Sequence, residues 1–316
     1  YRHTRAQTSP LDIEASQARR MPVPEPADGE MHWYLSRLDQ ALPPDDPDSR
    51  SRHPKIDATI KRTLDLWSRG EKVLIFSHFV RTTEALRDHL SRAMDRWILD
   101  QARRAFPSTT EEERRRELDL LGDSFFKDTG LRELATREIG RVIERHARLT
   151  SDERDKVVDV VRRFLRTPSF LVRFFPLDGP RSAGLRAAIN VQDASGLSLG
   201  EQIDGFCQFL AERCTEAERG EYLDALTKIQ TGTIYTGEAR EALRATGEPP
   251  GAELGRLPNV RLVYGKTRHE TRRLLMLAFN TPFFPEVLVS SSVLAEGVDL
   301  HLFCRHVIHH DLDWNP

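Results

Sequence analysis

The stretch KVLIFSHFVRTTEALRDHLSRAM, residues 72–94, decides the fold class. It opens with KVLIFS, a short run whose nearly continuous apolarity is typical of a parallel strand covered on both faces. The residues that follow repeat apolar side chains at helical spacing, through Leu86, Leu90 and Met94. A buried strand that leads directly into an amphipathic helix predicts an α/β protein with a parallel sheet.

The same alternation continues on both sides of this stretch. Before it, KIDATIKRTLDLW places apolar residues on one helical stripe, and Gly70 suits the helix C-cap. Much later the strand-like runs NVRLVYG, EVLVS and CRHVIHHDL appear, with the amphipathic segment RHETRRLLMLAF between the first two. We therefore expect one parallel sheet domain built from residues 55–94 and 256–316.

Between these two parts, residues 95–255 have helical patterns almost throughout. STTEEERRRELDLL has Ser108 and Glu111 at capping-box spacing, and TSDERDKVVDVVRRFLR has Thr150 and Glu153 at the same spacing. A connection of this length needs structure of its own, so we expect a large all-helical insertion with its own core.

Charge is unevenly distributed along this insertion. Residues 92–186 carry an excess of basic side chains, whereas residues 187–255 carry an excess of acidic ones. The first half could face nucleic acid, although charge on helices usually marks only a solvated face. Residues 1–54 are rich in proline and aspartate and predict an irregular linker or strap.

Composition limits the class of protein. The chain has 316 residues, a net charge of −2 and 39% hydrophobic residues, and it contains no apolar run long enough to span a membrane. It begins at Tyr1 without a leader, so we expect part of a longer cytoplasmic protein. Three cysteines without CxxC spacing argue against a disulfide framework and against a zinc site.

Polar residues stand where the predicted strands end. Ligands of open parallel sheets bind beyond the carboxyl ends of the strands, where groups that bind phosphate or ribose are expected. The residues at these ends are Ser77, His78, Phe79, Tyr264, Gly265 and Ser290 to Ser292. YGKT, residues 264–267, is not a phosphate-binding loop, because Val260 stands where that motif needs a glycine.

Taken in order, three segments resemble motifs IV, IVa and V of superfamily 2 helicases of the Snf2-like branch. They are KVLIFSHFVRTTEAL, VYGKTRHETRRLLMLAF and VLVSSSVLAEGVDLHLFCRHVIHHDLDWNP. The last is the most specific, because EG-x-D-L followed by a strand and D-L-x-W-N-P is a long pattern. The resemblance covers about a third of the chain and implies the second RecA-like lobe of such an enzyme.

The resemblance also implies roles for particular residues. Those that match nucleic-acid contacts are Ser77, His78, Phe79, Gly265, Arg268, Arg272, Ser291 and Ser292. Those that match positions beside the nucleotide are Glu296, Gly297 and Asp299. ATP and Mg²⁺ would be held mainly by the first lobe, and no catalytic residue is expected here. Structural roles stay open, since Asp299 could cap a helix, Phe79 could belong to the core and Arg272 could lie on a helix surface.

The histidines near the end of the chain are not expected to bind a metal. His301, His306, His309 and His310 follow strand alternation and lack the arrangement of a metal site.

Two departures from the family pattern stand out. The arginine-bearing motif VI and the P-loop lobe are absent, so we expect this chain alone not to hydrolyse ATP. Snf2 relatives carry helical protrusions near the start of this lobe, whereas the insertion here lies between motifs IV and IVa. Snf2-like proteins with large insertions occur in bacterial anti-phage systems such as DISARM, which is one context that the resemblance suggests.

The leading hypothesis is therefore the second motor lobe of an ATP-dependent DNA translocase or helicase. Double-stranded DNA and the first RecA-like lobe would be its partners. The alternative is a helical protein-interaction module, with a protein partner, carried on a RecA-like scaffold. A third possibility is an unrelated Rossmann-like enzyme, which the lack of a glycine-rich turn disfavours. The sequence does not decide between DNA and RNA or give a direction of movement.

Overall fold

The computed structural model describes residues 54–107, 109–229, 259–265, 267–291 and 299–311, which lie in one compact unit. The expected linker or strap, apart from Pro54, lies outside these residues. None of the described helices is long and apolar enough to cross a membrane.

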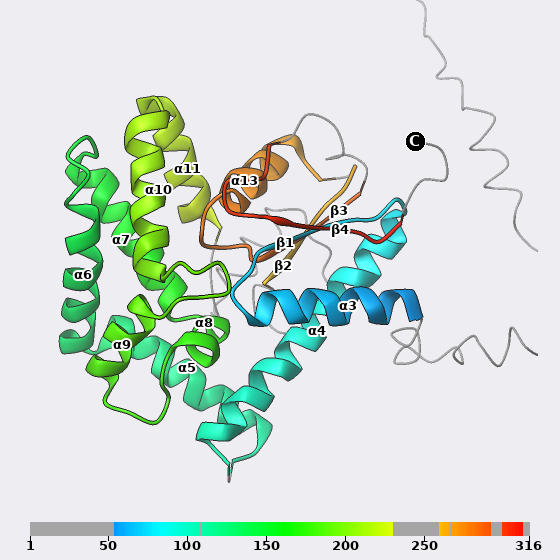
Figure 1. Ribbon diagram of the computed structural model, residues 1–316, viewed down its shortest axis with the longest axis horizontal. Helices are drawn as coiled ribbons and strands as arrows, with labels where there is room; N and C mark the ends of the chain where they lie inside the picture. Colours follow the sequence, from blue (N-terminus) through cyan, green and yellow to red (C-terminus); the bar gives the residue numbers. More distant parts are fainter. Residues whose placement is uncertain (1–53, 108, 230–258, 266, 292–298, 312–316) are drawn as a thin grey trace, which may run out of the picture. The chain divides into compact units, whose positions relative to one another are not determined.

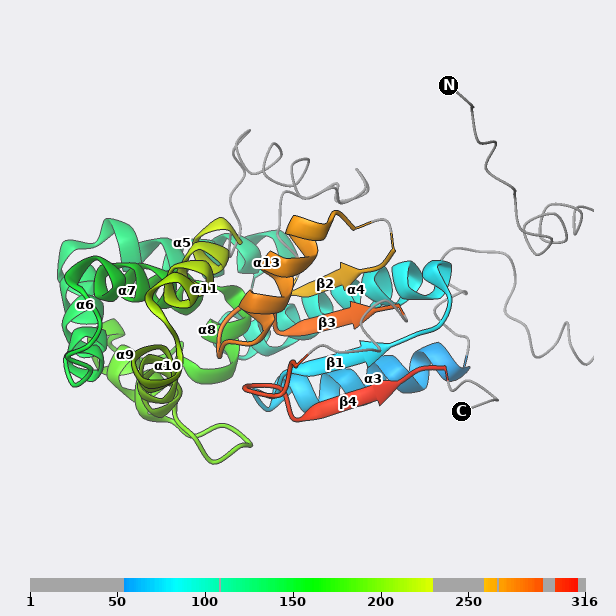
Figure 2. The ribbon, with the colours of Figure 1, turned by 90° about the horizontal axis from the view of Figure 1, so that it is seen from above.

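Four short parallel strands form the sheet at the centre of this unit. They are β1 (Val73–Phe76), β2 (Val260–Val263), β3 (Val287–Ser290) and β4 (His306–His309), arranged in the order β2-β3-β1-β4. Val73 pairs with Val287 on one side and with His306 on the other. All four arrows point the same way in Figure 2, so the carboxyl ends share one edge. The predicted α/β class with a parallel sheet is confirmed.

Three helices cover this sheet, namely α3 (Pro54–Ser68), α4 (Val80–Ala105) and α13 (His269–Phe279). Helix α13 lies on one face, and α3 and α4 lie on the other (Figure 1). The central strands are buried on both faces, which is why their sequences are apolar without alternation. The edge strand β4 is half-covered, with Val307 51% exposed.

Gly70 ends α3 as the sequence predicts. Its φ of 96° lies in the left-handed region, and its N–H donates to the carbonyl of Trp67 at 2.9 Å. A Cβ at this position would stand 2.7 Å from the Cβ of Asp193, which lies in the long segment between α4 and β2. Glycine is therefore needed here both for the backbone conformation and for the close approach of the insertion.

Helices also make up the long segment between α4 and β2. They are α5 (Glu111–Lys127), α6 (Thr129–Ile143), α7 (Ser151–Leu165), α8 (Pro168–Phe174), α9 (Arg181–Asn190), α10 (Leu199–Arg213) and α11 (Glu216–Lys228). The expected boundary at residue 95 falls inside α4, which runs on as one continuous helix. Residues 230–258 lie outside the described part of the chain.

Capping boxes begin four of these helices, and one of them differs from the prediction. The box at α7 is formed by Thr150 and Glu153, as predicted. At α5 the N-cap is Thr110, with Glu113 as its partner, rather than Ser108 with Glu111. The prediction placed this helix start two residues too early.

The insertion shares its core with the sheet, contrary to the expectation of a separate core. The buried apolar residues of the described segments form one continuous cluster. Phe283, just before β3, lies with its ring centroid 5.7 Å from those of both Phe164 on α7 and Phe206 on α10. The insertion is therefore packed as an integral part of the unit.

A buried ion pair fixes the insertion at the amino edge of the sheet. Arg173 of α8 pairs with Glu286, immediately before β3, and their side chains are 2% and 6% exposed. Trp67 donates its indole N–H to the same carboxylate at 2.9 Å. Figure 2 shows α5 to α11 at the end of the sheet from which the arrows start. The helices α5 to α11 thus lie away from the carboxyl ends of the strands.

Candidate functional site

The carboxyl edge of the sheet brings together most of the described residues that the sequence singled out. Backbone hydrogen bonds continue beyond the strands, from the N–H of Ser77 to the carbonyl of Ser290 at 2.9 Å and from the N–H of Ser291 to that of Val263 at 3.1 Å. The ends of β1, β2 and β3 are therefore held side by side.

Asp311, just after β4, organises this edge and was not predicted as a site residue. Its carboxylate accepts hydrogen bonds from Lys55 at 2.6 Å, from the Ser77 hydroxyl at 2.8 Å and from the backbone N–H of His78 at 3.2 Å. Burial alone would raise the pKa of Asp311, but these hydrogen bonds outweigh it and hold the pKa below its usual value. The strand-end rule that selected Ser77 would have selected Asp311 too, whereas nothing in the sequence pointed to Lys55.

The two serines expected to meet phosphate are both buried. Ser77 is 2% exposed and Ser291 is 3% exposed. Because the Ser77 hydroxyl already donates its proton to Asp311, a phosphate could receive it only if that bond were broken. In this structure Ser77 therefore positions Asp311 and the backbone of His78, and its contact with phosphate stays a prediction.

Other residues present an exposed surface at the same edge. Phe79 is 63% exposed, and His78 packs against it with ring centroids 5.0 Å apart. Gly265 and Arg268 are exposed beyond β2. Arg268 precedes the first turn of α13, where the helix dipole favours an anion. This surface therefore combines cationic, aromatic and backbone groups suited to a phosphate chain.

Arg272 lies one turn into α13 and is half-buried. Its guanidinium reaches back to the carbonyl of Thr267 at 3.5 Å, while its buried Nε has no hydrogen-bond partner among the described residues. The hydroxyl of Thr267 accepts from the N–H of Tyr264 at 3.1 Å, and its own N–H donates to the carbonyl of Tyr264 at 2.9 Å. Two hydrogen bonds thus join Tyr264 and Thr267 directly after β2.

Asp299 lies at the opposite end of the sheet. Its carbonyl accepts from the side-chain amide of Asn280 at 3.1 Å, and Asn280 is the C-cap of α13, at the amino edge. The Asp299 side chain is 67% exposed and pairs with His301. The structure therefore does not bring Asp299 together with Ser77, His78 and Arg268, and it shows Asp299 in a turn that precedes β4.

The remaining predicted residues, Ser292, Glu296 and Gly297, lie outside the described residues. Of the residues expected beside the nucleotide, the structure therefore describes Asp299, whose neighbours can be compared with the needs of a nucleotide. Its exposed carboxylate can accept a hydrogen bond from a ribose hydroxyl, and its described neighbours include His301 and Asn280. These groups fit a ribose but not a triphosphate with Mg²⁺, so no step of ATP hydrolysis follows from them.

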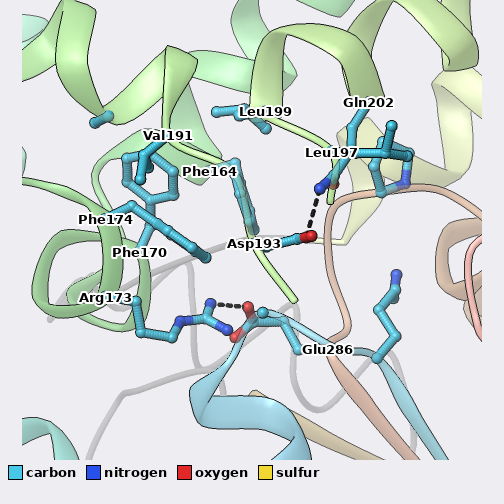
Figure 3. Close-up of a pocket in the computed structure, with 14 residues that line it drawn as sticks. Phe164, Phe170, Arg173, Phe174, Val191, Asp193, Leu197, Leu199, Gln202 and Glu286 are labelled. Carbon is cyan, nitrogen blue, oxygen red and sulfur yellow. Dashed lines mark hydrogen bonds and ion pairs between the residues drawn. The ribbon is translucent and has the colours of Figure 1, made fainter. Parts of the chain in front are cut away.

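A cavity of about 30 Å³ lies at the junction between the insertion and the sheet. Its walls combine phenylalanines of α7 and α8 with Lys72 and Glu286 from the strand starts. Figure 3 shows Arg173 pointing to Glu286 and Gln202 to Asp193 across it. Its charged side chains already bind groups of the protein, and its volume suits about two water molecules. We therefore regard it as part of the structural junction.

The clustered histidines have separate protein partners. His301 pairs with Asp299, His306 lies 3.3 Å from Glu71, His309 stacks on Phe76, and His310 bonds to Thr59. No group of three potential metal ligands occurs among the described residues. Of the cysteines, Cys207 and Cys304 are buried and Cys214 is half-buried, and all three are free thiols.

Comparison with known proteins gives one finding, and it concerns the C-terminal part of the chain. Residues 252–316 match the helicase conserved C-terminal domain. No curated protein and no solved structure matches the chain.

This helicase match includes three strands of the sheet but not the first. The strand β1 lies between β3 and β4 and is hydrogen-bonded to both, so it belongs structurally with the matched segment. Helices α3 and α4 flank β1 in the chain and cover the same sheet. The sheet that contains the matched segment thus also contains β1, and residues 54–94 pack on it.

Proposed function

We propose that this chain forms the second motor lobe of a nucleic-acid-dependent ATPase of the Snf2-like branch, which moves along double-stranded DNA. The observation that carries the proposal is the exposed carboxyl edge of a parallel sheet in a chain with a helicase C-terminal match. Nucleic acid would lie across this edge, where Phe79 and Arg268 are exposed.

The exposed groups have complementary roles in this proposal. Arg268 and the adjacent N-terminus of α13 attract a phosphate by charge and dipole. Phe79 offers an apolar ring to a sugar or base. The Asp311 network holds the His78 backbone in place. The edge therefore grips the backbone without reading the sequence, as a motor that moves along any track requires.

The nucleotide would be bound elsewhere on the lobe in this proposal. Asp299 would accept a hydrogen bond from the ribose, while the phosphates and Mg²⁺ would be held mainly by a first lobe. In this proposal the nucleotide and the nucleic acid bind at different ends of the sheet. Closure of the two lobes on ATP would then change the contacts that the carboxyl edge makes with nucleic acid.

Binding of a short duplex by the chain tests the proposed edge. We expect the double variant F79A/R268Q to bind duplex DNA more weakly than wild type, with the slope of log Kobs against log salt reduced by about 1, because one phosphate contact is lost. Arg137→Gln, at an exposed position on α6, is the charge-matched control. Equal binding by wild type and the edge variant would remove the assignment.

A second candidate function concerns the insertion. Because α5 to α11 lie at the amino edge, they are away from the carboxyl ends of the strands, which favours a protein-interaction role for them. Hydrogen exchange with bound duplex provides the test. Protection confined to the carboxyl edge supports this role, whereas protection of α5 to α11 favours direct contact with nucleic acid.

A further inference from the structure

Helix α4 carries a row of exposed arginines that the proposed edge does not include. Arg81, Arg92, Arg96 and Arg103 are all exposed. At about 100° per residue they fall within an arc of about 60° around the helix axis. The opposite side of α4 packs through Leu86, Leu90 and Met94, which are at most 2% exposed.

These arginines lack the carboxylate partners that other basic residues of this chain have. Many other basic residues in or next to the helices form an ion pair with an aspartate four residues earlier. These pairs are Lys61–Asp57, Arg69–Asp65, Lys127–Asp123, Lys156–Asp152, Arg163–Asp159 and Lys228–Asp224. None of the four arginines of α4 makes an ion pair with a described residue. Arg92 donates to His89 at 2.9 Å, which leaves its charge uncompensated by a carboxylate.

Two acidic residues of α4 are already engaged with other arginines. Asp88 binds Arg87 at 2.7 Å, and Asp95 binds Arg115 of α5 at 3.1 Å. Neither ion pair involves an arginine of the row, so the four guanidinium groups can bind an external anion. Asp100 is exposed four residues after Arg96 and three before Arg103, and it makes no ion pair with a described residue. With four arginines and one such carboxylate, the row keeps a net positive charge.

The position of the row connects it to the proposed edge. Helix α4 starts at Val80, directly after His78 and Phe79, and runs toward the insertion (Figure 1). From Arg81 to Arg103 the helix rises about 33 Å, at about 1.5 Å per residue. That length is close to one turn of B-form DNA, about 34 Å.

We propose that this row, Arg81, Arg92, Arg96 and Arg103, binds the phosphate backbone of a nucleic-acid duplex as it leaves the carboxyl edge. The inference rests on the proposed function and extends it by a second contact surface. A continuous helix fixes the backbone positions of the four arginines, so they can meet phosphates without the ordering of a flexible segment. An acidic protein is a different partner, and the test below separates the two.

The test compares two quadruple variants of the full chain. In the row variant the four arginines are replaced by glutamine, which keeps helix propensity similar. The control replaces Arg132, Arg137, Arg148 and Arg213, which are exposed and also lack ion pairs with described residues. Circular dichroism verifies that both variants fold. Binding to 30-base-pair DNA and RNA duplexes is measured over a range of salt concentrations, with polyglutamate as competitor.

We expect the row variant to reduce the slope of log Kobs against log salt by about 3 to 4. Each arginine–phosphate contact releases about 0.9 counterions from the duplex, and the variant loses four such contacts. The control should keep the wild-type slope. The inference is overturned if both variants lose slope equally, if the row variant binds like wild type, or if polyglutamate displaces the duplex at equal charge. The tighter of the two duplexes identifies the track.

The edge variant F79A/R268Q separates this inference from the proposed function. If only the row variant loses binding, the α4 arginines contact the duplex, and the assignment of Phe79 and Arg268 to nucleic-acid binding is wrong. If only the edge variant loses binding, Phe79 and Arg268 contact the duplex, and the proposed role of the α4 arginines is wrong. A wild-type chain that binds neither duplex at low salt overturns both.

Discussion

At the scale of single residues, Lys72 is a basic side chain buried beside the start of the sheet. Its ammonium donates to the carbonyls of Thr281 at 2.6 Å and Phe283 at 2.8 Å, and it lies 4.9 Å from the ring centroid of Phe279. Burial lowers the pKa of Lys72 to about 7, although Cys304 and Glu286 act in the opposite direction. The native protein therefore gives up this proton far below the pH at which an unfolded lysine does.

This difference predicts a pH dependence of stability. Between about pH 7 and 10 the unfolded chain keeps the Lys72 proton and the native chain does not, so the free energy of unfolding should rise with pH. We expect wild type to gain on the order of a few kcal/mol relative to Lys72→Met over this range. Urea denaturation at a series of pH values measures it. Lys61→Met, at an exposed position, is the control, and a constant difference between wild type and Lys72→Met would contradict the expectation.

Individual site residues were predicted unevenly from the sequence. His78, Phe79, Gly265 and Arg268 lie at the expected edge because parallel strands end together there. The burial of Ser77 was not predictable, because it depends on a bond to Asp311, which is distant in the chain. The place of Asp299 likewise depends on how the chain returns from β3 to β4, which strand patterns do not specify.

At the scale of secondary-structure elements, the helix starts carry a second prediction. Thr150 accepts from the N–H of Glu153 at 3.2 Å, and the Glu153 side chain returns to the N–H of Thr150 at 2.8 Å. Thr150→Ala should lower the free energy of unfolding by about 1 kcal/mol, since it removes an N-cap. Thr136→Ala, within α6, is the matched control and should change it much less. Equal losses in chemical denaturation would show that capping is not the cause.

Elements were predicted well where a single local pattern decides them. Strand-like runs located all four described strands. In β1 and β3 the run is apolar because a buried parallel strand is covered on both faces, whereas the edge strand β4 is covered on one face only. The start of α5 was placed wrongly for a local reason. STTEEE offers three hydroxyl–glutamate pairs at the same spacing, and the helix begins with the third, Thr110 with Glu113.

At the scale of the whole molecule, the sequence did not reveal how the insertion is attached. The contacts that fix it join Trp67, Arg173 and Glu286, which come from three distant parts of the chain. Helical patterns describe the faces of each helix but not which other element they meet. An ion pair between residues far apart in the chain leaves no pattern in the sequence near either residue. Only the folded structure therefore shows that the described helices of the insertion and the sheet share one core.

One shared interior predicts a single cooperative unfolding transition. Glu286→Gln leaves Arg173 buried without its counter-charge, so it should lower the free energy of unfolding by about 3 to 5 kcal/mol. Tryptophan fluorescence, to which the fully buried Trp67 at the junction contributes, should shift together with the helical signal in circular dichroism, because most of the described helices belong to the insertion. Replacing both partners by methionine should recover most of the loss, since an apolar pair carries no unpaired charge. If the helical signal of Glu286→Gln instead persisted beyond the fluorescence transition, the insertion would have a stable core of its own, and lobe and insertion would be two units joined at α4.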